Sequence, residues 1–298
     1  MPQRTLLPCL ALALALPLAA RQAPKPLPKE MEQALRDRVA RGEEIYEYER
    51  LAWVASDMLV ASKADPKEAG MWVEVPSGDR RYIFFGRFKT PQDPIGRPEG
   101  FGAPYVFWAP MGKPDEVHAV QIPSPEQART PDEETKRLRA AAAGIEPLAQ
   151  AADRIRKQPS PWHLPWNYDV FREKDGTITG YLMPGNSDSS VIPIGGDFRI
   201  TLDPTGTKIL KSLPLHKSYL PMSTQPPPGA QRTAGMWHTH TLDEDLPPET
   251  DLGILRLYPG GVPHYLMTRY GLFVFTEKYQ LLFLETKDEL ESEERKAK

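Results

Sequence analysis

The stretch AGMWHTHTLDEDLPPETD, residues 234–251, decides how the C-terminal part of this chain is interpreted. It begins with the pattern of a strand, in which residues two apart face the same side, so His238 and His240 should project their imidazoles into one place. The proline pair that ends at Pro248 predicts a short helix, because proline suits the first helical position. Asp251 then falls in the first turn of that helix.

Two histidines and one carboxylate in this order predict a metal site. Imidazole nitrogens suit a borderline metal such as zinc, with bonds of ~2.0–2.1 Å. Three protein ligands leave one coordination position for water, which is the arrangement of a catalytic zinc site. We therefore take His238, His240 and Asp251 as the candidate metal ligands and Zn²⁺ as the candidate cofactor. His216 is a further candidate ligand.

A second interpretation of the histidine pair stays open. A His-x-His pattern alone is common, and the two imidazoles could instead hydrogen-bond to the acidic loop that follows them, at Asp243, Glu244 and Asp245. The sequence identifies no partner for the remaining histidines, which are His118, His163 and His264.

The spacing around this pair resembles the signature of the JAMM/MPN-type metallopeptidase domain, H-x-H-x7-S-x2-D, in which Ser or Thr commonly lies between the histidines. The resemblance covers roughly residues 166–284. It implies a mixed sheet flanked by helices, zinc held by His238, His240 and Asp251, and hydrolysis of a peptide or isopeptide bond. A peptide or protein substrate would follow.

Two positions depart from that family's pattern. Pro248 aligns with the family serine, and proline offers neither a hydroxyl nor an N–H. Thr177 aligns with the upstream catalytic glutamate, and threonine cannot serve as a general base toward a zinc-bound water at neutral pH. Glu173 or Asp188 would take that place only if the alignment slips. The alternative function is therefore a catalytically silent periplasmic binding or envelope-structural protein.

Residues 1–20 have the pattern of a secretory signal peptide: Arg4, an apolar stretch over 6–18, and small residues at 19 and 20. Pro8 and Pro17 interrupt the apolar stretch. Cleavage would leave no transmembrane segment and would remove Cys9, the single cysteine of the chain. The order WNYDVF, then Gly-Gly before a strand, then the histidine segment also resembles uncharacterised secreted proteins of Gram-negative bacteria. We expect a periplasmic or secreted protein.

The composition excludes several classes. The chain has 298 residues, a formal net charge of −3 and a hydrophobic fraction of 40%. There is no global basic field, so generic nucleic-acid binding is not expected. One cysteine supplies neither a disulfide framework nor a thiolate zinc cluster. The 33 prolines predict short elements separated by rigid turns. The sequence does not indicate an oligomeric state.

Periodicity and turn residues predict an α+β fold. Residues 31–64 have helical spacing, which Gly42 could interrupt. Thr130 should cap a second helix, with Pro131 in its first position and a bend at Pro147. The strands are predicted as hairpins around Pro or Gly turns, over 71–88, 105–122, 170–183, 198–210 and 265–285.

The predicted organisation follows this order of elements. It comprises a signal peptide (1–20), a proline-rich linker (21–30), an N-terminal α+β region (31–125), a connecting helix (126–158), a C-terminal JAMM-like domain (159–285) and a charged tail (286–298). Trp162, Trp166 and Tyr168 could form an aromatic platform for a glycan or peptide. We favour a clamp that pins a loop to the sheet, because packing of aromatic rings on proline is ordinary core behaviour.

Overall fold

A computed structural model describes residues 23–63, 70–86, 105–120, 132–186, 188, 190–226, 229, 233–240, 242, 244–258 and 261–297. Packing divides the chain into two compact units. Unit 1 contains residues 1–42, 189–192 and 222–298, and unit 2 contains residues 43–188 and 193–221. The predicted signal peptide lies outside the described residues.

The first sheet of unit 2 has the strand order β1-β2-β3-β4 and is antiparallel throughout. Its first hairpin turns at Gly78, where φ is +64° and a side chain would be strained. This is the turn that the Pro-Ser-Gly-Asp sequence predicts. The strands are β1 (Met71–Ser77), β2 (Arg80–Gly86), β3 (Tyr105–Pro110) and β4 (His118–Ala119).

The second sheet of unit 2 is also antiparallel, with the order β5-β6-β8-β9. Its two hairpins turn at Gly176 and Gly206, both with positive φ. The side chain of Asp203 accepts hydrogen bonds from the backbone N–H groups of Thr207 and Lys208, which fixes the second turn. The strands are β5 (Trp166–Arg172), β6 (Ile178–Pro184), β8 (Phe198–Leu202) and β9 (Ile209–Pro214).

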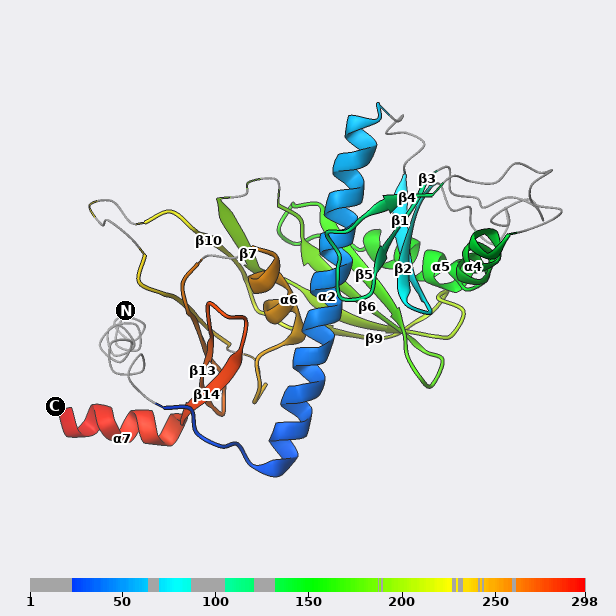
Figure 1. Ribbon diagram of the computed structural model, residues 1–298. Helices are drawn as coiled ribbons and strands as arrows, with labels where there is room; N and C mark the ends of the chain where they lie inside the picture. The colour runs from blue at the N-terminus through cyan, green and yellow to red at the C-terminus, as the bar shows by residue number, and fades with distance from the viewer. Residues whose placement is uncertain are drawn as a thin grey trace. The chain divides into compact units, whose positions relative to one another are not determined.

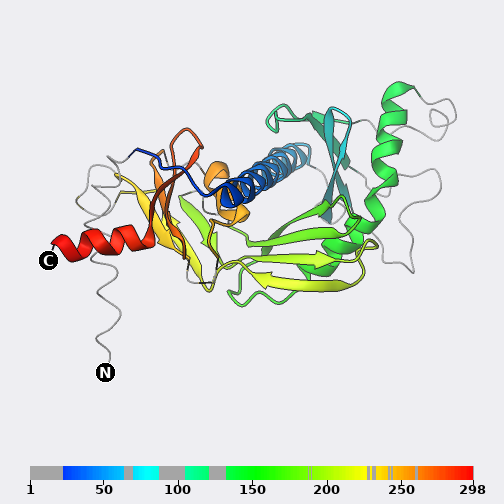
Figure 2. The same cartoon turned by 90° about the horizontal axis from the view of Figure 1, so that it is seen from below.

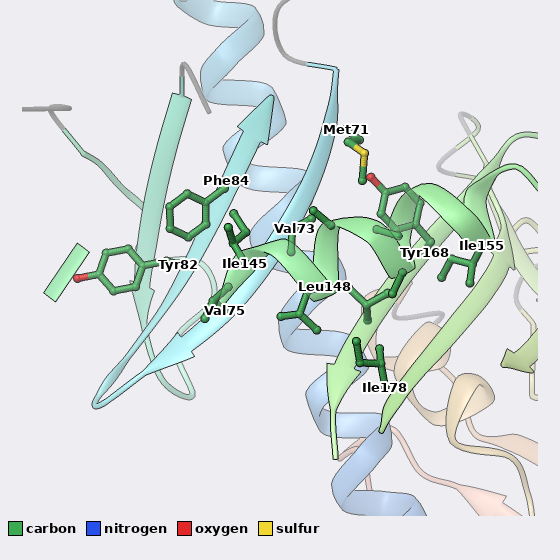
Figure 3. Packing of buried hydrophobic residues seen from close by; sticks show 14 of the residues in the cluster. Met71, Val73, Val75, Tyr82, Phe84, Ile145, Leu148, Ile155, Tyr168 and Ile178 are labelled. Atoms are coloured by element: carbon green, nitrogen blue, oxygen red, sulfur yellow. The ribbon is translucent and has the colours of Figure 1, made fainter. Parts of the chain in front are cut away.

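Helices α4 (Glu133–Ala143) and α5 (Ile145–Arg156) supply the main core of unit 2. The apolar side of α5 packs on both sheets, as Figure 3 shows for Ile145, Leu148 and Ile155. Figure 2 gives a second view of α5 against the β5–β9 sheet. Tyr168 joins this core by exchanging hydrogen bonds with the backbone of Trp72, as donor at 3.1 Å and acceptor at 3.0 Å.

Helix α2 (Lys29–Ala61) is one continuous element of 33 residues that begins in unit 1 and ends in unit 2 (Figure 1). Its second half packs Leu51, Ala55 and Leu59 on the face of the first sheet opposite α5. The expected interruption at Gly42 is therefore absent. Glycine weakens a helix, but neighbours can outweigh that propensity.

A cluster of buried charged side chains, Glu49, Glu74 and Arg81, lies where the second half of α2 meets the first sheet. Glu49 is 6% exposed and accepts a hydrogen bond from Asn167 on β5 at 3.1 Å. Glu74 on β1 is 1% exposed, and Arg81 on β2 places its guanidinium 4.1 Å from the ring centroid of Tyr48. Burial, first of all, raises the pKa of Glu49 to about 7 and that of Glu74 well above its usual value.

Unit 1 is built on a mixed sheet with the order β11-β12-β13-β14. β11 and β12 are parallel, whereas the other two pairings are antiparallel. Helix α6 (Glu249–Leu257) connects the parallel pair, and α7 (Lys287–Ala297) contacts β13 and β14. Residue Leu290 of α7 packs on the sheet, so the charged tail is an anchored helix. The strands are β11 (Met236–Thr239), β12 (His264–Met267), β13 (Gly271–Phe275) and β14 (Leu281–Thr286).

Two further features tie distant segments together. β7 (Val191–Gly195) and β10 (Tyr219–Ser223) form a two-stranded sheet, and the unit boundary falls within both strands. In unit 1, Lys25 donates its backbone N–H to Phe283 O on the edge strand β14 at 3.0 Å. Its ammonium group lies 3.4 Å from Glu285 and 3.1 Å from Glu289.

The predicted α+β fold is confirmed, as are the five predicted hairpins where they fall on described residues. The start of α4 differs from expectation: Asp132 is the N-cap and accepts a hydrogen bond from the Thr135 N–H at 2.7 Å. Thr130 and Pro131 lie outside the described residues. The break between α4 and α5 falls at Gly144, which leaves Pro147 in the first turn of α5, where its missing N–H costs nothing.

The six predicted segments, from 1–20 to 286–298, stay predictions, because the two units are defined by packing contacts and each combines stretches that are distant in sequence. None of the helices among the described residues combines the length and apolar composition that crossing a membrane requires.

Candidate metal site

Strand β11 brings the two histidines to one face of the unit 1 sheet. His238 is 4% exposed and His240 is 6% exposed, whereas Thr239 between them is exposed. His240 follows the last β11 residue and still donates its backbone N–H to Met267 O at 2.7 Å. Pairing with β12 thus keeps the alternation that the sequence predicted, and the imidazoles share the buried face.

Helix α6 delivers the carboxylate. Pro248 is its N-cap residue, with extended backbone angles of −70° and 153°, so the helix begins at Glu249 as the proline pair predicted. Asp251 is the third helical residue and is 1% exposed. The N-terminal end of a helix carries partial positive charge, which favours a carboxylate in the first turn.

The three donor atoms converge on one point. His238 Nε2 lies 3.0 Å from His240 Nε2 and 2.9 Å from Asp251 Oδ2. His240 Nε2 lies 2.9 Å from the same oxygen. A tetrahedral zinc ion with bonds of ~2.05 Å separates its ligand atoms by about 3.3 Å. The triangle formed by His238 Nε2, His240 Nε2 and Asp251 Oδ2 therefore needs to open by only a few tenths of an ångström, and these donors fit such an ion.

Burial gives the triangle an electrostatic reason to take a cation. The side chains of His238, His240 and Asp251 are between 1% and 3% exposed. A carboxylate removed from water is costly unless it is paired or bound to a metal. Imidazoles that ligate a metal do so in their neutral form, so the negative charge of Asp251 would be offset by a divalent ion. The group could therefore hold a metal ion.

The acidic loop before α6 is held by arginines from elsewhere in unit 1. Arg38 on α2 pairs with Glu244 at 2.5 Å and donates to the carbonyl oxygens of Leu246 and Pro247. Arg269 pairs with Asp245 at 2.7 Å. Asp243 lies outside the described residues. These ion pairs engage two of the three acids that the alternative interpretation assigned to the histidines.

Helix α6 is also fixed from α2, through Gly42. A Cβ atom built on Gly42 would lie 2.7 Å from Leu252 Cβ and 3.0 Å from Glu249 O. Only a residue without a side chain allows α2 to approach the first turn of α6 so closely. The glycine that the sequence offered as a helix break is thus a packing contact beside the Asp251 turn.

His264 is a site residue that the sequence analysis missed. It begins β12, is 2% exposed, and its Nε2 lies 2.8 Å from His238 Nδ1. Burial, first, and the neighbouring His238 lower the pKa of His264 to about 3, so its imidazole is neutral. Alternation along β12 places His264 on one face of that strand. To infer its contact with His238, however, one must know that β12 pairs with β11.

His216 belongs to unit 2. It is 7% exposed, and its Nδ1 lies 2.5 Å from Asp197 Oδ1. As a metal ligand, His216 stays a sequence prediction. His118 stacks on Trp108 at 4.3 Å, and His163 has a positive φ of 56°.

The other residues weighed from the sequence lie in unit 2, in hairpins and loops. Thr177 donates its hydroxyl to Asp175 in the β5–β6 turn at 2.7 Å. Glu173 lies in the same turn, with its N–H donated to Thr177 O, and Asp188 is exposed. None of these observations assigns a catalytic carboxylate.

The aromatic cluster behaves as a clamp. Trp162 donates its indole N–H to Gly196 O at 3.1 Å, and Trp166 donates to Gln158 O at 2.8 Å. The ring of Tyr168 stacks on Trp72 with centroids 4.7 Å apart. Each indole and phenol is thus committed to the packing of unit 2.

Comparison with known proteins adds no assignment to this geometry. The chain matches no known family model, no curated protein and no solved structure. The converging histidines and aspartate of unit 1 are the feature of this chain that points to a chemical function.

Proposed function

We propose that this chain is an exported zinc-binding protein with a JAMM-like C-terminal part, in which His238, His240 and Asp251 ligate one zinc ion. The convergence of the three buried donor atoms within 3.0 Å of one another carries the proposal. Imidazole nitrogens with a carboxylate oxygen suit zinc, whereas Mg²⁺ and Ca²⁺ prefer sites in which every ligand is oxygen.

The first candidate activity is hydrolysis of a peptide or isopeptide bond, which the JAMM/MPN resemblance implies. Bound zinc would lower the pKa of a water molecule and polarise a substrate carbonyl. The protein residues orient that ion: β11 fixes the two imidazoles, and the first turn of α6 fixes the carboxylate.

A silent metal protein is the second candidate, and the position of the acids favours it. Among the described residues of unit 1, the buried carboxylates besides Asp251 are Glu249 and Glu285. Glu285 lies beside the Lys25 ammonium group. Glu249 precedes Asp251 by two residues, so the helix turns its side chain about 200° away. With Pro248 at the N-cap in place of a serine, this leaves the general base unassigned.

The metal content of the mature chain, residues 21–298, tests the proposal. We expect about one zinc per chain in the wild type and a loss of most of it in His240→Ala, because two ligands cannot retain what three hold. Thr239→Ala on the exposed side of the same strand is the matched control and should keep its zinc. A wild-type protein that takes up no metal would overturn the proposal.

A peptidase screen then separates the two candidates. Turnover of peptide or isopeptide substrates by the zinc-loaded wild type, lost on chelation and in His240→Ala, would support the hydrolase. A stoichiometric zinc protein without turnover would support the silent binding or envelope-structural role.

A further inference from the structure

The contact between His264 and His238 has a geometry that the proposed zinc site can use. In the parallel register, Met236 pairs with His264 and His238 pairs with Leu266. His264 therefore lies diagonally across from His238 on the same face of the sheet. Their ring centroids are 5.0 Å apart at an interplanar angle of 72°, and the nitrogens Nδ1 of His238 and Nε2 of His264 lie 2.8 Å apart.

The direction of this hydrogen bond decides which nitrogen of His238 has a free lone pair. If His264 donates, the neutral His238 ring carries its proton on Nε2, the atom that faces Asp251 and His240. If His238 donates from Nδ1, its Nε2 lone pair points at the triangle. Only the second arrangement allows His238 to ligate a metal through Nε2.

We propose that His264 is a positioning residue that accepts the Nδ1–H of His238 and so presents the Nε2 lone pair of His238 to zinc. The proposal rests on the zinc site proposed above. Metal-ligating histidines usually donate their other N–H to a carboxylate, a backbone carbonyl or water, which fixes both tautomer and ring orientation. Here a neutral imidazole takes that role.

An imidazole acceptor has a consequence for charge. A carboxylate in this place would add a second negative charge beside the zinc and offset more of the ion's charge. An imidazole that accepts a hydrogen bond at Nε2 carries no charge, so zinc with His238, His240 and Asp251 would form a set of net charge +1. The bound ion would therefore stay more electrophilic than one whose histidine is backed by a carboxylate.

The other nitrogen of His264 must then carry a proton. Among the described residues, His264 Nδ1 is buried and has no hydrogen-bond partner. The proposed tautomer therefore leaves the His264 Nδ1–H without a protein acceptor among the described residues.

Two substitutions at position 264 test the proposal. His264→Gln keeps a side-chain oxygen that can accept the His238 Nδ1–H, whereas His264→Leu fills similar space without an acceptor. We expect His264→Leu to weaken zinc affinity about tenfold to a hundredfold, the usual effect of losing a hydrogen-bond partner behind a ligand. His264→Gln should stay within a few-fold of the wild type. Affinity is measured by competition with a chromophoric chelator.

A second readout separates positioning from simple packing. Long-range ¹H–¹⁵N spectra of the zinc-loaded wild type should show His238 protonated at Nδ1, and the visible spectrum of the Co²⁺-substituted protein should change in His264→Leu more than in His264→Gln. Phe275→Leu, which alters the residue paired with His264 on β13, is the packing control: it should lower the thermal midpoint of the apo protein and leave zinc affinity unchanged.

The two proposals fail in different ways. If the wild type binds zinc and both His264 variants bind it equally well, the positioning role is overturned and the zinc site stands. If the wild type takes up no metal, the zinc site itself is overturned. An Nε2-protonated His238 in the zinc-loaded protein would also overturn the positioning role.

Discussion

Glu49 is a carboxyl group that folding has removed almost entirely from water. Burial raises its pKa to about 7, against a usual value of 4.5, while the hydrogen bond from Asn167 lowers it. Between those two values the folded protein binds more protons than the unfolded chain. Stability should therefore fall as pH rises through this window and level off above pH 7.

The Glu49→Gln variant isolates this effect. Glutamine can still accept the hydrogen bond from Asn167 but does not ionise, so the variant should gain about 3 kcal/mol over the wild type at pH 8 and little at pH 4. Urea unfolding at both pH values measures the difference. Glu146→Gln, on the exposed side of α5, is the control and should leave the pH dependence of stability as it is in the wild type. A Glu49→Gln effect of equal size at both pH values would contradict the argument.

At the same scale, the candidate ligands could be named from the sequence because their signal is local. His238, His240 and Asp251 lie within 14 residues: the strand period predicts that the two histidines share a face, and the spacing of the JAMM/MPN signature adds Asp251. His264 could not be named, because its contact depends on which strand lies beside β11. A lone histidine at the start of a strand carries no such information.

The α2–α6 contact shows how an element can depend on one missing side chain. Gly42→Ala improves helix propensity by about 1 kcal/mol, which alone would stabilise α2. The added Cβ, however, would meet Leu252 Cβ at 2.7 Å and Glu249 O at 3.0 Å, and neither is the mobile end of a side chain. We expect a net loss of about 1–3 kcal/mol.

Gly144→Ala is the matched control. Gly144 also adjoins a helix, but its nearest neighbour to an added Cβ is Ala141 O at 3.9 Å and its φ is −92°. That variant should be neutral or slightly stabilising in thermal unfolding. Because α6 carries Asp251, Gly42→Ala should also weaken zinc binding, and equal stability of the two variants would refute the close-packing argument.

Elements were predictable where the turn chemistry was local, as at Gly78, Gly176 and Gly206. The sequence did not predict the β7–β10 pair or the parallel β11–β12 pair, since neither is closed by a short turn. Gly42 shows the opposite case. Helix propensity alone predicts an interruption there, but the contact that requires glycine is with α6, more than 200 residues further along the chain.

For the whole molecule, the sequence predicts export, and removal of the predicted signal peptide (residues 1–20) can be measured. Expression of the full chain in a Gram-negative host should yield a periplasmic or secreted protein that begins at Arg21, as read by mass spectrometry of the intact chain. Leu12→Arg, which places a charge in the apolar stretch, should block processing. A conservative Leu12→Ile should not. Unprocessed wild-type protein in the cytoplasm would contradict the proposal.

The tie between Lys25 and the edge strand β14 has a consequence for the order of events during synthesis. Lys25 and its partner Glu285 are 260 residues apart. A ribosome adding 5–20 residues per second needs about 10–50 s to cover that distance. Through that interval residues 23–28 have no β14 to contact, and both four-stranded sheets of unit 2, which end at Pro214, are synthesised before β14. The start of the described chain is therefore available to a chaperone or a translocation factor until nearly the last residues are made.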